Sequence, residues 1–435
     1  MKREMVVSKT PWISAYPADW KQVPLHALFK EHKNKNKDGN EQNLLSLSYG
    51  NIIRKDINSN EGLLPESFNG YNIVDDGDIV LRLTDLQNDH RSLRTGLVTE
   101  RGIITSAYLT LRKKATLNSE YYHYLLHAFD IMKVFYSMGE GVRQSLGYDE
   151  LSYVVIPQPS MDEQHAIVHY LDSKCSAIDE AIERHKKIIE KMEEYKRDTV
   201  SNVVLRGLHE CETIHSELIP WVGEIPAHWS TPRIRDYAEF LNGDRSSNYP
   251  SGNDIVESGI AFLTSDNLWG DIVDINREKA KYITREKYDS LRGVKLAIDD
   301  IVYCLRGSVG KCAINTSLTE GTVASSLTVI RPSKRISSKY LLYVLNSTIV
   351  KQQNDDYMNG SCAANLAADS VRNYRIVFPP IEEQDEIVHY LDKRATEIGR
   401  IIEKHIAIIE KLEEYRKSII YNAVTGKIDC REVAQ

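Results

Sequence analysis

The sequence lacks several features that define common protein classes. Its six cysteines show neither Cys-x-x-Cys spacing nor grouping with histidine, which argues against a disulfide framework or a zinc site and fits a reducing compartment. No run of 18 apolar residues occurs, and the N-terminal stretch has no apolar core of the signal-peptide type. We therefore expect neither membrane spans nor secretion, and a cytoplasmic location.

An excess of positive charge is also missing. The 55 basic residues are outnumbered by 62 acidic ones, which gives a net charge of -7, and residues 1–160 and 208–380 are each close to balanced. A chain of this composition that binds DNA must gather its basic side chains on one face. Composition by itself argues mildly against a nucleic-acid partner.

Motifs of catalytic and metal sites are absent as well. The sequence contains no His-Glu-x-x-His, no Gly-x-Ser-x-Gly and no Asn-Pro-Pro-Tyr/Phe. The stretch 307–311, Gly-Ser-Val-Gly-Lys, resembles a phosphate loop, but Leu305 and Cys312 stand where that loop needs glycine and serine or threonine. We interpret it as a tight turn between strands, and we expect no catalytic residue, metal site or cofactor in this chain.

What the sequence does contain is a long internal repeat. Residues 163–195 and 383–415 are identical at 19 of 33 positions, and each copy keeps an unbroken 3,4,3,4 apolar spacing. Such a pattern predicts a helix that packs along its whole length against another helix. A helix of roughly 45 residues is about 70 Å long, more than one compact domain needs. We expect a two-helix spacer that holds apart the segments preceding each helix; two buried helices of a single bundle are the alternative.

The predicted helix seam, with the positions beside it, also offers a docking surface for partners. Its residues are Val168, Leu171, Ile178, Ile182, His185, Ile189, Met192 and Tyr195 in the first copy, and Val388, Leu391, Ile398, Ile402, His405, Ile409, Leu412 and Tyr415 in the second. The two seam histidines should lie near each other and fix helix register. The apolar stripe is wider than one seam requires, so it contacts a further partner or packs under the chain's own domains.

A globular domain precedes each long helix. Both domains open with Pro-Ala-x-Trp, at 17–20 and 226–229, and share further strand-like and helix-like segments around unlike loops. Short alternating strands, glycine-rich turns and a few helices predict two mixed α/β domains in an α+β chain. The expected boundaries are 1–159 for the first domain, 160–207 for its helix, 208–220 for a linker, 221–379 for the second domain, 380–427 for its helix and 428–435 for a tail.

Basic residues in the unlike loops are the candidates for contact with DNA. Lysine and arginine contact phosphates, and arginine can read base edges with two hydrogen bonds. For any single one of these residues, an ordinary solvated surface charge is the favoured interpretation. The candidates are Lys33, Lys35, Lys37, Arg54, Arg82, Arg91, Arg94 and Arg143 in the first domain, and Arg245, Arg277, Lys279, Lys281, Arg285, Arg292, Arg306 and Lys311 in the second.

The order of domain, helix, domain, helix resembles the specificity subunit of type I restriction-modification systems over essentially the whole chain. The residues that carry the resemblance are PSMDEQHAIVHYLD at 159–172, PIEEQDEIVHYLD at 380–392, the Ile-Pro-x-His-Trp opening at 225–229 and RQSLGYDEL at 143–151. The second copy has Ala-Ala-Asn-Leu at 363–366 where the first has Arg-Gln-Ser-Leu, so a role for Arg143 does not carry over to it.

This resemblance implies a non-catalytic subunit with two target recognition domains. Each domain would read half of a bipartite site in double-stranded DNA, and the two long helices, as an antiparallel coiled coil, would set the gap. Two modification (methyltransferase) subunits would dock on the chain and endonuclease-translocase subunits would join them, with S-adenosylmethionine, ATP and Mg on those partners. The rivals are a tandem ligand-binding or adhesin-like protein with a coiled-coil spacer and, third, a catalytic protein with a duplicated, unrecognised active site.

Overall fold

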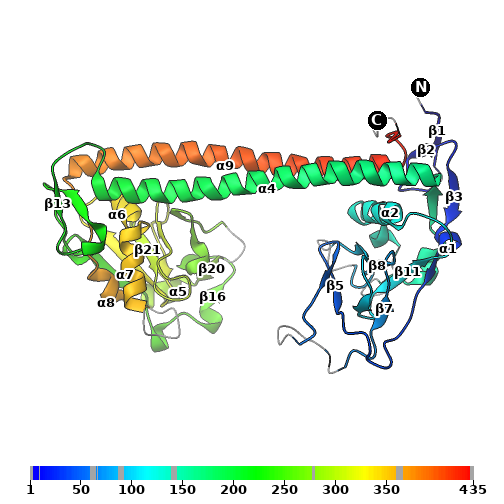
Figure 1. Cartoon of the computed structure of the whole chain (residues 1–435). Coiled ribbons are helices and arrows are strands. Elements are labelled where there is room, and N and C mark those ends of the chain that lie inside the picture. Colours follow the sequence, from blue (N-terminus) through cyan, green and yellow to red (C-terminus); the bar gives the residue numbers. More distant parts are fainter. Residues whose placement is uncertain are drawn as a thin grey trace. The chain divides into compact units, whose positions relative to one another are not determined.

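The computed structural model describes residues 3–8, 10–58, 65, 67–86, 93–138, 145–276, 280–358 and 366–431. The chain forms two compact units. Unit 1 comprises Met1–Lys186 with Ile406–Gln435, and unit 2 comprises Lys187–His405. Each combines strands and short helices with parts of both long helices (Figure 1), which confirms the predicted α+β class. No helix within the described ranges has both the length and the apolar composition of a membrane span.

The two predicted long helices are present. They are α4 (Met161–Arg206) and α9 (Ile381–Val424). At the start of α4, the Ser160 hydroxyl accepts a hydrogen bond from the Glu163 backbone N–H at 3.3 Å, as an N-cap does. Beyond their C-terminal ends, Gly207 (φ +73°) and Gly426 (φ +72°) adopt the left-handed conformation that ends many helices.

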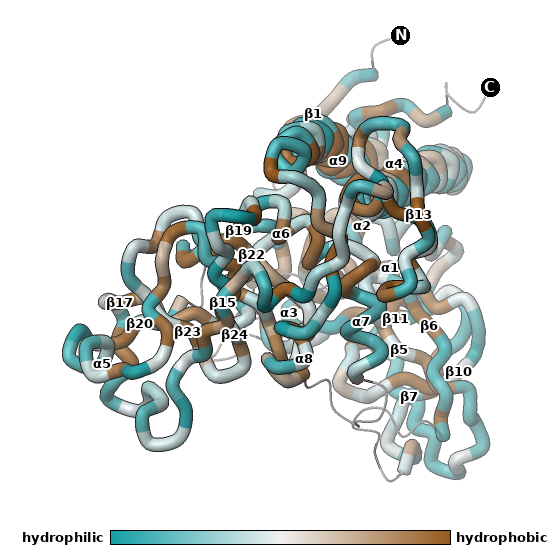
Figure 2. Tube along the Cα trace, turned by 90° about the vertical axis from the view of Figure 1, so that its left-hand side faces the viewer, coloured by the Kyte–Doolittle hydropathy of each residue, from teal (hydrophilic) through white to brown (hydrophobic). Residues whose placement is uncertain are grey.

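In unit 1, the first half of α4 packs against the last half of α9. Ile178 and Ile182 share a buried cluster with Ile419, and Asp179 pairs with Arg416 at 3.2 Å. Nearer the start of α4, Val168 and Leu171 share a cluster with Ala423 and Val424, whereas Leu412 packs with the later Ile178 and Ile182. Residue numbers therefore rise along one helix while they fall along the other, which confirms the antiparallel pairing. Figure 2 views both long helices nearly end-on, and their turns carry hydrophobic as well as hydrophilic residues.

In unit 2, the last half of α4 packs against the first half of α9. Val200 and Val204 lie in one buried cluster with Ile387 and Leu391. This is the antiparallel arrangement of unit 1 with the roles of the helices exchanged. The seam histidines His185 and His405 belong to different units, so their predicted proximity stays a prediction.

The globular part of unit 1 is built on a four-stranded antiparallel sheet in the order β4-β11-β8-β9. Smaller two-stranded pairs surround it. Its strands are β1 (Met5–Val7), β2 (Ala15–Pro17), β3 (Lys21–Pro24), β4 (Phe29–Glu31), β5 (Leu45–Ser48), β6 (Asn51–Arg54), β7 (Asn72–Val74), β8 (Ile79–Leu81), β9 (Thr95–Leu97), β10 (Gly102–Ile104), β11 (Leu109–Lys113) and β12 (Val155–Gln158). Its short helices are α1 (Leu25–Leu28), α2 (Ser119–Ile131), the 3-10 turn Val134–Ser137 and α3 (Tyr148–Ser152).

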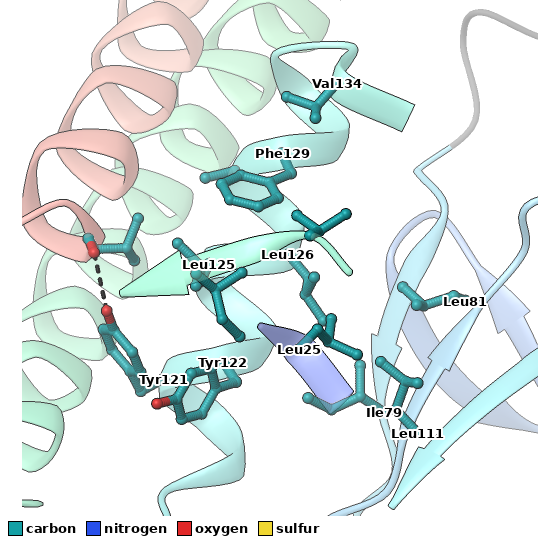
Figure 3. Packing of buried hydrophobic residues seen from close by; sticks show 14 of the residues in the cluster. Leu25, Ile79, Leu81, Leu111, Tyr121, Tyr122, Leu125, Leu126, Phe129 and Val134 are labelled. Atoms are coloured by element: carbon teal, nitrogen blue, oxygen red, sulfur yellow. Dashed lines mark hydrogen bonds between the residues drawn. The ribbon is translucent and has the colours of Figure 1, made fainter. Parts of the chain in front are cut away.

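The core of unit 1 lies between this sheet, α2 and the long helices. Leu125 and Phe129 of α2 point into it together with Ile79 from the sheet (Figure 3). Tyr121 is fully buried, and its hydroxyl donates to the Val424 carbonyl oxygen at the end of α9, 3.0 Å away. One apolar core thus joins the sheet to both long helices, and the domain is anchored to the spacer over a wide area.

Unit 2 contains a six-stranded sheet, β15-β24-β21-β22-β19-β18, and a four-stranded sheet, β16-β20-β17-β23. Its strands are β13 (Thr213–His215), β14 (Glu224–Pro226), β15 (Ala238–Asn242), β16 (Ile255–Val256), β17 (Ile260–Leu263), β18 (Leu268–Trp269), β19 (Ile272–Val273), β20 (Lys281–Ile283), β21 (Ile301–Cys304), β22 (Cys312–Ile314), β23 (Thr322–Val323) and β24 (Leu327–Pro332). Its helices are α5 (Arg285–Ser290), α6 (Ser338–Leu345), α7 (Thr348–Met358) and α8 (Ala368–Arg372). β13 lies within residues 208–220, so this predicted linker includes a paired strand; the domain boundaries drawn from the sequence remain predictions.

The two units repeat the same central pair of antiparallel strands. β8 pairs with β11 as β21 pairs with β24, and a buried aspartate precedes the first strand of each pair. Arg112 binds Asp78, and Arg331 binds Asp300 with both hydrogen bonds at 2.7 Å. Because these contacts fall at equivalent places, the sequence repeat reflects a repeated frame.

Candidate nucleic-acid interface

A hollow of about 680 Å³ opens in unit 2 where β15 and β21 end. Its walls are Asn242, Gly243 and Arg245 after β15, Leu305 and Arg306 after β21, and residues 366–369 at the start of α8. The Leu366 backbone N–H donates to the Leu305 carbonyl oxygen at 2.8 Å, which fixes α8 against the end of β21. The hollow therefore sits on a hydrogen-bonded frame while its rim carries polar side chains.

Close packing shapes the loop that carries Arg245. A Cβ on Gly243 would lie 2.1 Å from the Val323 carbonyl oxygen, so only glycine fits there. Asp244 then accepts hydrogen bonds from the Gly293 backbone at 2.6 Å and from the Asn248 side chain at 2.9 Å. These contacts fix the loop and leave Arg245 exposed at its tip.

Arg245 and Arg306, 61 positions apart, are thus brought to one hollow, and both side chains are exposed. Guanidinium groups can bind phosphates or read guanine, and the amide of Asn242 can read adenine. Sequence reasoning proposed the two arginines and missed Asn242, because a single asparagine at a strand end carries no distinguishing signal.

Other cations predicted in unit 2 lie outside this hollow. Lys281 on β20 and Arg292 after α5 are exposed. Lys311 is partly buried, and its ammonium donates to the Ser265 carbonyl oxygen at 3.0 Å. Lys311 follows the turn that joins β21 to β22, in which Gly310 has a φ of +86°. The predicted turn between strands is confirmed.

Two predicted arginines are engaged in surface ion pairs. Arg54 binds Glu100, and Arg285 binds Glu320 through two hydrogen bonds of 2.8 and 2.6 Å. Each arginine lowers the pKa of its partner carboxyl group. Exposed pairs of this kind contribute little to stability, so either arginine can exchange its carboxylate for a phosphate at small cost.

Three predicted lysines of unit 1 lie between β4 and β5. Lys33, Lys35 and Lys37 are all exposed. Lys33 pairs with Glu31 at 2.7 Å, and the Lys35 ammonium donates to the Gly70 carbonyl oxygen at 2.8 Å. They are spaced two residues apart in the sequence, and we call them the basic strip, since lysine ammonium groups bind phosphates.

The structure corrects the expectation for Arg94. Its side chain is fully buried, with 0 % exposure, and its guanidinium donates to the backbone carbonyl oxygens of residues 82, 84 and 85. A buried guanidinium cannot reach DNA, so Arg94 leaves the set of proposed contacts. Arg82 is partly buried. Arg91, Arg143, Arg277 and Lys279 lie outside the described residues.

The long helices bury most of the predicted seam and leave a second surface. Val168, Leu171, Ile178, Ile182, Leu391 and Ile398 are buried, and His185, Ile189, Met192, Val388, Ile402, His405, Ile409 and Leu412 are partly buried. Tyr195 and Tyr415, at equivalent positions of the repeat, are 51 % and 50 % exposed. Ile401 and Ile408 are also exposed on α9 at seven-residue spacing before Tyr415. An apolar stripe of this kind suits a protein partner.

One group of residues could in principle hold a metal ion. Among the described residues, ligand atoms of His32, Asp75 and Asp78 lie within 4.8 Å of one another. Arginine already neutralises both carboxylates: Arg112 binds both, and Arg101 binds Asp75 at 2.8 Å. The two carboxylates are therefore satisfied within an ion-pair network that joins strands.

Sequence reasoning missed how the repeated motifs contact each other. The Trp20 indole N–H donates to Glu163 at 2.8 Å, and the Trp229 indole N–H donates to Glu383 at 2.9 Å. The tryptophans close the Pro-Ala-x-Trp motifs, and the glutamates open the Glu-Gln motifs of the long helices. Their joint recurrence in both halves was a signal that could have predicted the pairing.

Comparison with known proteins gives a consistent family. Residues 227–413 match the type I restriction modification DNA specificity domain. The MjaVIII specificity subunit of a type I restriction enzyme from Methanocaldococcus jannaschii is 24 % identical over 344 residues, 77 % of this chain and 76 % of that protein. The putative MjaX specificity subunit of the same organism is 25 % identical over 323 residues, 72 % and 69 % of the two chains.

Solved structures agree in fold. A chain from a structure that concerns complex assembly and conformational transition of the type I R-M system has a TM-score of 0.69, with 16 % identity and coverage of 95 % of this chain and 99 % of that one. The HsdS subunit from Thermoanaerobacter tengcongensis has a TM-score of 0.50, with 15 % identity and coverage of 95 % and 98 %. Residues 227–413 thus match a type I restriction modification DNA specificity domain, and most of the chain is similar in sequence to specificity subunits of type I restriction enzymes.

Proposed function

We propose that this chain is the DNA-reading subunit of a type I restriction-modification complex. Each globular domain reads one half of a bipartite site in double-stranded DNA, and α4 and α9 set the distance between the halves. The observation that carries this proposal is the repeated unit of domain and helix, which keeps one frame while its loops differ. A common frame with unlike loops is typical of two modules with different targets.

The proposed DNA contacts are the exposed or partly buried cations in and beside these loops. In unit 2 they are Arg245 and Arg306 at the hollow, with Lys281, Arg285, Arg292 and Lys311 as further contacts. In unit 1 they are Arg54, Arg82 and the strip of Lys33, Lys35 and Lys37. Because the net charge is -7, binding depends on these local groups, and it should weaken steeply with salt.

The proposed partners are two modification subunits and, through them, endonuclease-translocase subunits. The half-exposed Tyr195 and Tyr415 support this assignment, since the repeat places an equivalent apolar site on each long helix for two copies of one partner. S-adenosylmethionine, ATP and Mg belong to those subunits in the proposal. This chain contributes target selection and no chemistry of its own.

Methylome sequencing of a host with and without this chain tests the proposal. The expected result is loss of methylation at one two-part motif when the chain is removed, with other motifs unchanged. An unaltered methylome, in a host that expresses the modification subunits, would contradict it. A ligand-binding or adhesin-like protein would leave every methylated motif in place.

A further inference from the structure

In unit 1, the start of α4 binds the globular part through two buried side chains. Glu163, 4 % exposed, accepts the Trp20 indole N–H at 2.8 Å. Gln164, 2 % exposed, accepts the Asn118 backbone N–H at 2.8 Å, where α2 begins. Its amide nitrogen also donates to the Pro159 carbonyl oxygen at 2.9 Å. The Glu-Gln pair thus links the helix to two separate parts of the domain.

Unit 2 repeats these contacts at the start of α9. Glu383 accepts the Trp229 indole N–H at 2.9 Å, and Gln384, 0 % exposed, accepts the Ser337 backbone N–H at 2.9 Å, where α6 begins. The Gln384 amide nitrogen donates to the Pro379 carbonyl oxygen at 3.0 Å. The same pair of side chains does the same work in both halves of the chain.

A third contact lies nine residues further along each long helix. Asp172 accepts a hydrogen bond from the Tyr124 hydroxyl of α2 at 2.7 Å. Asp392 accepts one from the Tyr343 hydroxyl of α6, also at 2.7 Å. We use the name joint for the three helix residues of each unit with their partners: Glu163, Gln164 and Asp172 in unit 1, and Glu383, Gln384 and Asp392 in unit 2.

The geometry of each joint restricts both roll and tilt of the domain on its helix. Glu163 and Gln164 are neighbours and point about 100° apart around the helix, while Asp172 lies about 13.5 Å further along its axis. Apolar contacts tolerate small shifts, whereas hydrogen bonds weaken steeply as distance and angle change. Contacts at three separated points therefore hold one orientation more strictly than the apolar core alone.

We propose that the two joints make the chain selective for the spacing between the half-sites. Their residues are positioning residues: they hold each recognition domain at a fixed angle to α4 and α9 and do not contact DNA. The inference rests on the proposed function, because spacing has meaning only if two domains read one duplex. A looser joint would let a domain rotate and accept half-sites that are too close or too far apart.

The experiment compares variants of the chain in complex with its modification subunits. Duplexes carry the mapped half-sites at the native spacing or with one base pair removed or added. The double substitution Tyr124→Phe/Tyr343→Phe removes one hydrogen bond from each joint and keeps both rings. The matched control, Tyr148→Phe/Tyr282→Phe, removes hydroxyls that donate to carbonyl oxygens within their own globular parts, at 2.9 and 3.4 Å.

In the joint variant, the ratio of affinities for native and altered spacing should fall at least roughly threefold, because a hydrogen bond is worth on the order of a fivefold change in an equilibrium. The control variant should keep the preference. Both variants should lower the melting temperature by a similar few degrees, because each loses two hydrogen bonds, and both should keep the salt dependence of the wild type. Undiminished spacing preference in the joint variant, or an equal loss in the control, overturns the inference while the proposed function stands. Absence of any spacing preference in the wild type would instead overturn the proposed function itself.

Discussion

Replacing Arg94 with alanine tests whether this side chain stabilises unit 1 or contacts DNA. Its guanidinium donates to the backbone carbonyl oxygens of Arg82 at 3.1 Å, Thr84 at 2.8 Å and Asp85 at 3.3 Å. Its Nε donates to the Tyr136 hydroxyl at 2.9 Å. These contacts tie the segment that follows β8 to the turn that follows α2.

The expected loss is large on the scale of a folded domain. A hydrogen bond to a charged group contributes about 1.5–3 kcal/mol, but four such bonds do not add, since carbonyl groups near the surface regain water. We expect Arg94→Ala to lower the free energy of unfolding of unit 1 by about 3–5 kcal/mol, a large part of the 5–15 kcal/mol typical of a domain. Arg94→Lys keeps the charge but loses the planar fork, so it should recover only part of this loss.

Urea unfolding of the full chain, with Arg54→Ala as control, measures the effect. The Arg54 side chain is 72 % exposed and forms a surface ion pair with Glu100. Because such a pair contributes little to stability, Arg54→Ala should leave the urea midpoint of unfolding nearly unchanged. If Arg94→Ala unfolded at the wild-type urea concentration and instead lost affinity for duplex DNA, the structural role assigned to Arg94 would be wrong.

Three further predictions address the DNA contacts, pH and helix pairing. If Arg306 contacts a phosphate, Arg306→Ala should reduce the slope of log affinity against log salt by about 1. If Arg306 contacts a base, the substitution should cost about 1–3 kcal/mol of binding free energy at one base position. No change in the salt slope or in the affinity for any base variant would show that Arg306 is an ordinary surface charge. Burial lowers the pKa of His127 to about 3 and of His123 to about 4. Below about pH 6.5 the unfolded chain therefore binds more protons than the folded chain, so unit 1 should lose stability as the pH falls from about 6.5 towards 4. His127→Gln should flatten this dependence in urea unfolding at a series of pH values, and an unchanged curve would refute the assignment. Leu171→Cys with Ala423→Cys should form a disulfide under mild oxidation, because both side chains lie in one buried cluster of antiparallel helices; failure to cross-link would count against that pairing.

The sequence predicted the features that depend on local periodicity. The two long helices and the seam between them follow from a seven-residue apolar repeat, whereas the repeat by itself does not set the direction of pairing. The shared strand-like segments of the two domains were also recognised, and the antiparallel pairs β8–β11 and β21–β24 are equivalent in the two units. These signals lie within a few residues of the elements that they predict.

Features that depend on distant contacts could not be found in the same way. Arg94 looked like a surface loop cation, because nothing near it in sequence shows that residues 82–85 fold back over it. The meeting of Arg245 with Arg306 requires the order of strands in the sheet, which no local pattern provides. The pairing of tryptophan with glutamate lies between these cases, since both motifs were recognised and their contact was not.

The exchange of one recognition domain tests the central claim most directly. Residues 221–379 are replaced with the corresponding segment of another specificity subunit, and the methylated motif of a host that carries the chimera is determined by methylome sequencing. The account predicts that one half of the two-part motif changes to that of the donor, while the other half and the spacing stay the same. A motif in which both halves change together, or neither half changes, would contradict the reading of one half-site by each domain.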